Sequence, residues 1–122
     1  MTDRVFDAEQ AQAALPMLRE LLPRIRDARR ALIDASERIT DAVAVDGGGV
    51  SGSDWFDAQE RLRVDLTTLA EHGILLRDPE VGLVDFPAER EGRTVFLCWR
   101  LDEDRVEWFH EVHGGFTKRK PL

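Results

Sequence analysis

One feature constrains this chain more than any other: apolar residues recur at steps of three and four along its first third. The positions are Ala11, Ala14, Leu18, Leu21, Ile25, Ala28, Leu32, Ala35, Ile39 and Ala42. Two apolar residues in seven are typical of the seam that one helix offers to another. The other side, from Arg24 to Asp41, alternates charges of opposite sign as a solvated helix face does. The spacing therefore predicts a long helix that packs on a second helix.

The start of this helix is marked by a capping signal. Asp7 can cap, Gln10 stands at the capping-box position, and Phe6 precedes them as a hydrophobic staple. Pro16 and Pro23 follow inside the apolar repeat. Because proline removes a hydrogen bond and clashes with the preceding turn, we expect a short helix near residues 8–14. A long helix over 16–45 follows, with Pro16 in its first turn.

A glycine-rich turn separates this helix from a second one. Residues 46–53 read DGGGVSGS, which is no phosphate loop because no Gly-Lys-Ser/Thr is present and no strand precedes it. Ser53 or Asp54 caps the second helix, and Gly73 ends it. Its apolar stripe comprises Trp55, Ala58, Leu62, Leu66 and Leu69. Two helices joined by a short loop form an antiparallel hairpin.

After Gly73 the apolar period becomes strand-like. The strand-like runs are 83–88, 94–101 and 105–112, with a possible edge strand at 74–77. Short turns between them predict an antiparallel meander. The fold class expected is α+β, in which a long antiparallel helical hairpin packs on a small antiparallel β-meander. We expect a single domain over 1–122, with the hairpin at 7–72 and the meander and tail at 74–122.

Composition narrows the class of protein. A chain of 122 residues with 43% hydrophobic and 34% charged residues can bury a core as one globular domain. Its net charge of −7 disfavours general binding to nucleic acid or anionic membranes. The single cysteine cannot form an internal disulfide, and no apolar run reaches membrane-spanning length. We expect a cytoplasmic protein with no nucleic-acid or membrane partner.

The chain resembles a known bacterial family, domain of unknown function 2203. The resemblance rests on GILLRDPEVGLVDFPAEREGRTVFLCWRLDED, on His110 and on the closing GGFTKRKPL, with GLVDFPA and LCW the most specific parts. FDAEQAQAALPMLRELLPRI is similar to the family's N-terminal segment, so the likeness covers nearly the whole chain. Phe109-His110 stands where the family tends to have Trp-His, and Thr117-Lys118 where it usually has Ala-Gly. The resemblance implies no activity.

The expected turns determine which strand residues face each other. Two-residue turns at Glu91-Gly92 and Glu103-Asp104 predict the pairs Asp85 with Cys98, Phe86 with Leu97, Arg100 with Glu107, Cys98 with Phe109, and Leu97 with His110. Since strand side chains alternate, one face is the apolar core: Val84, Phe86, Val95, Leu97, Trp99, Leu101, Val106, Trp108 and His110. The other face is mixed: Leu83, Asp85, Phe96, Cys98, Arg100, Glu107, Phe109 and Glu111.

The mixed face carries the candidate binding residues. Asp85, Arg100 and Glu107 can bind an anionic or amidic ligand, or they can form a structural salt-bridge network. Cys98 is expected to be packed and unreactive, because no histidine shares its predicted face. His110 is expected at the edge of the core with one hydrogen bond.

Two further features complete the candidate residues. Arg119 can reach Glu103 or Asp85 if Phe116 is buried. Glu107, His110 and His113 have the spacing Glu-x-x-His-x-x-His, which converges on a helix and not on a strand. We therefore expect the protein to bind no stoichiometric zinc, no other metal and no cofactor.

These observations favour a binding or assembly module without catalytic activity that self-associates through its helices. The alternative is a small-molecule-binding protein or minor enzyme with a polar site at Asp85, Arg100 and Glu107 near His110. The length mismatch between the helices leaves Leu18 and Leu21 without a helical partner, which predicts a homodimer with residues 14–28 at its interface.

Overall fold

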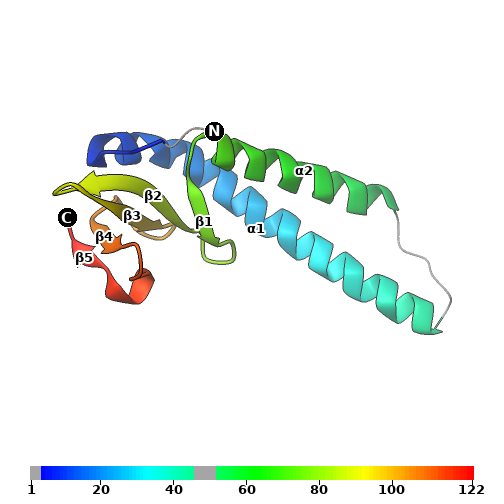
Figure 1. Cartoon of the computed structure of the whole chain (residues 1–122). Coiled ribbons are helices and arrows are strands. Elements are labelled where there is room, and N and C mark those ends of the chain that lie inside the picture. The colour runs from blue at the N-terminus through cyan, green and yellow to red at the C-terminus, as the bar shows by residue number, and fades with distance from the viewer. Residues whose placement is uncertain (1–3, 46–51) are drawn as a thin grey trace.

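A computed structural model describes residues 4–45 and 52–122 of the chain (Figure 1). Two antiparallel helices come first, α1 (Ala8–Val45) and α2 (Gly52–Glu71). A five-stranded antiparallel sheet follows in chain order: β1 (Leu75–Asp78), β2 (Leu83–Arg90), β3 (Arg93–Arg100), β4 (Trp108–Glu111) and β5 (Lys120–Pro121), with a 3-10 turn, η1 (Phe116–Lys118), before β5. The α+β prediction is confirmed. The glycine-rich turn predicted over 46–53 falls largely outside the described residues.

The predicted capping box starts α1. The Gln10 N–H donates to Asp7 Oδ1 at 2.7 Å, and the Asp7 N–H donates to Gln10 Oε1 at 3.0 Å. The predicted break at Pro16 is wrong, because α1 continues through both Pro16 and Pro23. Pro16 is exposed, so water can reach the carbonyl that proline leaves without a partner. Burial of neighbours such as Leu18 in the core then holds the helix together.

The first half of α1 lies across one face of the sheet (Figure 1). Leu18, Leu21 and Ile25 are buried there, at 0%, 5% and 1% exposure, in one core with Phe86 and Trp99. The reason given for a dimer interface at residues 14–28 is therefore wrong, since the sheet itself covers these side chains. Self-association stays a prediction without that support. Within the described residues, neither helix is long and apolar enough to cross a membrane.

The hairpin continues past the sheet as a two-helix arm (Figure 1). Small residues let the helices approach closely: Ala28 and Ala35 on α1 and Ala58 on α2 are all buried. The Arg24 guanidinium donates to both carboxylate oxygens of Asp65 across the helix pair, at 3.1 and 2.7 Å. Asp65 is buried, so this pair fixes the alignment of the two helices.

The register between β2 and β3 is as predicted. Asp85 pairs with Cys98 and Phe86 with Leu97. Glu91 and Gly92 form the connecting turn with φ of 55° and 75°, the positive values that a two-residue hairpin with the right twist requires.

The predicted register between β3 and β4 is wrong by one residue. The observed pairs are Phe96 with His110, Leu97 with Phe109 and Cys98 with Trp108. A shift of one residue moves every side chain of a strand to the opposite face. Phe109 is therefore in the core, while Trp108 and His110 lie on the outer face, contrary to the sequence prediction.

The cause is the connection before β4, which is longer than a two-residue turn. Gln12 on α1 donates from Nε2 to the Val106 carbonyl at 2.8 Å and accepts the Val106 N–H on Oε1 at 3.0 Å. The Val106 side chain is buried in the core, and Trp99 Nε1 donates to the Glu103 carbonyl at 3.0 Å. The connection thus folds down onto α1 before β4 begins.

The tail folds back along the edge of β4 that does not pair with β3. β5 pairs with it through Trp108–Pro121 and Phe109–Lys120. Arg119 donates two hydrogen bonds to the Glu103 carboxylate, at 2.9 and 3.0 Å, so the prediction that it reaches Glu103 or Asp85 is confirmed for Glu103. Its guanidinium also lies over the rings of Trp108 and Phe116.

Candidate functional site

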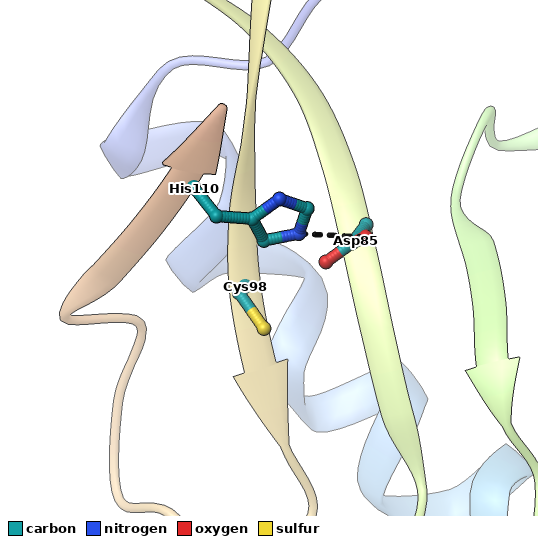
Figure 2. Close-up of side chains that lie close together, drawn as sticks. All are labelled: Asp85, Cys98 and His110. Atoms are coloured by element: carbon teal, nitrogen blue, oxygen red, sulfur yellow. Dashed lines mark hydrogen bonds and ion pairs between the residues drawn. The ribbon is translucent and has the colours of Figure 1, made fainter. Parts of the chain in front are cut away.

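Three neighbouring strands each contribute one side chain to a buried cluster: Asp85 from β2, Cys98 from β3 and His110 from β4 (Figure 2). Asp85 lies opposite Cys98 in the ladder. His110 stands two residues beyond the partner of Cys98, so it shares the same outer face. All three are at most 3% exposed. The register shift at β4 therefore builds this cluster.

The polar atoms of the cluster converge. His110 Nε2 lies 3.0 Å from Asp85 Oδ2, and the Cys98 side chain lies beside this pair (Figure 2). One nitrogen, one sulfur and one oxygen atom all lie within 4.8 Å of one another. Imidazole nitrogen, thiolate sulfur and carboxylate oxygen are the three atom types with which proteins bind zinc.

The Asp85 carboxylate is only half satisfied by protein groups. Oδ2 accepts from Arg77 Nε at 2.8 Å and faces His110 Nε2. Oδ1 is buried and has no hydrogen-bond partner within the described part of the chain. A buried oxygen without a partner is costly. A cation next to Oδ1 would remove that cost.

The other ring nitrogen of His110 has two possible partners. Nδ1 lies 2.7 Å from the Glu111 carbonyl and 3.1 Å from the Gly115 N–H. A protonated Nδ1 donates to the carbonyl, whereas an unprotonated one accepts from the N–H. In the neutral ring, the first tautomer leaves a lone pair on Nε2 for a metal ion, and the second places the proton on Nε2 to donate to Asp85. His110 Nδ1 therefore has a hydrogen-bond partner in either tautomer of the neutral ring.

The Cys98 thiol is strongly held in its protonated form. Burial raises its pKa to about 12, the negative charge of Asp85 adds to the rise, and Arg119 opposes it. A thiol with this pKa is no nucleophile near neutral pH. The sequence also predicts an unreactive cysteine, but its reason, that no histidine shares the face, is wrong because His110 does. A metal ion would have to displace the thiol proton.

The three residues of the cluster line a cavity of about 370 Å³. The other lining residues are Arg77, Leu83, Val112, His113, Gly114, Gly115 and Phe116. A larger hollow of about 790 Å³ lies against the end of α2 and β1, and it shares only Arg77 with the cavity. We place the site in the smaller cavity, because convergent polar atoms identify a site better than volume does.

The structure brings together three of the six residues that the sequence proposed for binding. Those three are Asp85, Cys98 and His110. Arg100 pairs with Asp102, with Nε 2.5 Å from Oδ1, and the predicted Arg100–Glu107 strand pair does not form. Glu107 is exposed and lies outside the cavity lining.

Two arginines complete the comparison with the sequence prediction. Arg119 pairs with Glu103 and acts on Cys98 through its charge. Arg77 is not among the residues that the sequence proposed for binding. The predicted edge strand at 74–77 could have indicated it, because that strand pairs with β2 beside Asp85.

A comparison with protein families identifies a matching family. The model of the family described as an uncharacterized conserved protein, DUF2203, covers residues 4–122. No curated protein and no solved structure matches.

Proposed function

The chain belongs to the DUF2203 family, as its resemblance predicts, and we propose that it binds one divalent transition-metal ion, with zinc the best fit, through Asp85, Cys98 and His110. The observation that carries this proposal is the convergence of three different metal-binding side chains, all buried and with ligand atoms within 4.8 Å of one another.

The mixture of donor atoms favours zinc. Thiolate selects soft or borderline ions, and imidazole suits zinc, copper, iron and nickel. Magnesium and calcium prefer oxygen ligands only. Zinc accepts sulfur, nitrogen and oxygen ligands in one tetrahedral shell. All three ligand atoms of this set are therefore of types that zinc binds.

The separations of the ligand atoms are close to those of a loaded site. Bond lengths of about 2.0–2.3 Å in a tetrahedral zinc shell place neighbouring ligand atoms about 3.5 Å apart. One ligand atom from each of Asp85, Cys98 and His110 already lies within 4.8 Å of the other two, so the longest separation has to shorten by only about 1 Å.

The hydrogen-bond partners of His110 and Asp85 also fit a metal site. A histidine that binds metal through one nitrogen usually donates its other N–H to a carbonyl or carboxylate. The Glu111 carbonyl lies 2.7 Å from His110 Nδ1 and supplies that acceptor. Arg77 donates to Asp85 Oδ2 at 2.8 Å and leaves Oδ1, which has no partner in the described chain, for the ion.

This proposal departs from the sequence prediction of no metal, which rested on Glu107, His110 and His113. In function it lies between the two classes that the sequence favoured. It keeps the binding module without an assigned reaction, and it replaces the polar site at Asp85, Arg100 and Glu107 by a metal site at Asp85, Cys98 and His110. Self-association through the helices is a separate proposal, and sedimentation equilibrium of the metal-free and loaded protein tests it.

Zinc content after dialysis tests the proposal. The reduced protein is loaded with excess zinc, dialysed extensively and measured by atomic emission. We expect about one equivalent in the wild type and a loss of at least tenfold in retained zinc for Cys98→Ala and His110→Ala, because ligand removal typically costs more than the 10–100-fold of supporting partners. His72→Ala is the matched control, since His72 bonds Thr68 on α2 away from the cluster. Wild-type protein without zinc would refute the proposal.

A further inference from the structure

We propose that the bound ion keeps one coordination position open to the cavity and that this position takes the carboxylate of a small organic acid, which Arg77 positions. The inference rests on the proposed metal-binding function. It adds the chemical class of the ligand and the residue that selects it.

The open position follows from the number of ligands. The cluster in the described chain has three members, whereas zinc takes four ligands. Zinc sites with four protein ligands are structural, and sites with three keep the fourth position for water or substrate. All three ligands line the cavity of about 370 Å³, so we infer that the fourth position faces this space.

The net charge of the loaded site favours an anionic ligand. The two charges of the ion are balanced by the Asp85 carboxylate and the Cys98 thiolate. Arg77 then leaves one positive charge, because Arg119 is already neutralised by Glu103 at 2.9 Å. Among the described residues that line the cavity, Asp85 is the only acidic one. In a partly buried site this excess charge favours one negative charge on the ligand.

Size and wall chemistry limit the rest of the ligand. Ligand cavities span about 300–1,000 Å³, so the observed volume of about 370 Å³ suits a small molecule. The walls include Leu83, Val112 and Phe116, which favour a short apolar body.

Arg77 is held in a position to fix the carboxylate. Its Nε donates to Asp85 Oδ2 at 2.8 Å, and its guanidinium lies 5.1 Å from the Phe96 ring centroid. The side chain is 45% exposed and lines the cavity. Guanidinium binds carboxylate through two parallel hydrogen bonds, which the ammonium group of lysine cannot form. Arg77 is thus a positioning residue for the ligand.

Cobalt absorption spectroscopy tests the inference on the full chain. Co²⁺ replaces zinc, a near-ultraviolet thiolate band reports the Cys98 bond, and the visible bands report the fourth ligand. We expect acetate and butyrate to change the visible bands saturably, while the isosteric neutral acetamide does not. In cobalt-saturated Arg77→Lys we expect acetate to bind about tenfold more weakly than in the cobalt-saturated wild type, the equivalent of losing one charge-assisted hydrogen bond. Arg30→Lys on α1 is the matched control.

The outcomes separate the two proposals. Absence of the thiolate band refutes the metal site itself. A thiolate band with visible bands that no carboxylate alters refutes the open position alone. An equal response to acetamide refutes the charge argument. Unchanged acetate affinity in cobalt-saturated Arg77→Lys refutes the role of Arg77.

Discussion

His110 Nε2 lies 3.0 Å from Asp85 Oδ2, although 25 residues separate them in the chain. Both side chains are buried on the outer face of the sheet. The pair exists because β4 lies one residue out of the register that a two-residue turn before it would set. The metal site that we propose thus depends on how the connection from β3 to β4 folds.

Gln12 should be the main determinant of that connection. Gln12→Ala removes both hydrogen bonds to Val106, and at ~0.5–1.5 kcal/mol each we expect the free energy of unfolding to fall by about 1–3 kcal/mol. Zinc affinity should fall as well, because the connection that sets the register of β4, and so the position of His110, is held less firmly. Urea denaturation measures the first effect and zinc competition with a chelator the second. Gln59→Ala, at an exposed position of α2, is the control. Equal stability of both variants would contradict this role.

Cys98 should resist modification in the folded, metal-free protein. Its pKa is raised to about 12 by burial and by Asp85, and only the thiolate reacts. At pH 8 we expect iodoacetamide to modify the folded protein far more slowly than the protein unfolded in guanidinium chloride, as mass spectrometry can follow. Rapid modification of the native thiol would show that the site is open and the thiol activated.

Leu21→Glu should unfold the protein and not merely dissociate subunits. Leu21 is 5% exposed in the core between α1 and the sheet. Replacing it removes apolar burial and introduces a buried charge, so we expect a loss on the order of 3–5 kcal/mol. Circular dichroism during heating measures it. A stable, monomeric Leu21→Glu beside a dimeric wild type would place residues 14–28 at an interface after all.

Arg119 and Glu103 should be energetically coupled. Their paired hydrogen bonds of 2.9 and 3.0 Å are largely shielded from water. Combining Arg119→Met with Glu103→Gln in a double-mutant cycle should give a coupling energy of about 1–3 kcal/mol. A coupling near zero would mean that β5 and the aromatic contacts alone hold the tail.

The sequence predicts the parts of the fold that local signals determine. The capping box of Asp7 and Gln10 and the turn at Glu91-Gly92 involve neighbouring residues, and the structure has both as predicted. Helix and strand periods were sufficient for the α+β class. The capacity of α1 to pass through Pro16 was not predictable in this way, because it depends on burial against the sheet.

The candidate site was predictable in part. Asp85 and Cys98 were assigned correctly to one face, since the turn between their strands is local. His110 was assigned to the wrong face, because its register depends on a contact between Gln12 and Val106 that spans 94 residues. Local sequence does not indicate that contact, so the cluster became apparent only in the folded chain.

X-ray absorption at the zinc edge of the loaded protein tests the central claim most directly, because it identifies the ligand atoms themselves. The account predicts one sulfur neighbour at about 2.3 Å and nitrogen or oxygen neighbours at about 2.0–2.2 Å. Cys98→Ser should remove the sulfur signal and leave the wild-type fold. A zinc shell without sulfur, or one with more than one sulfur, would contradict binding by Asp85, Cys98 and His110.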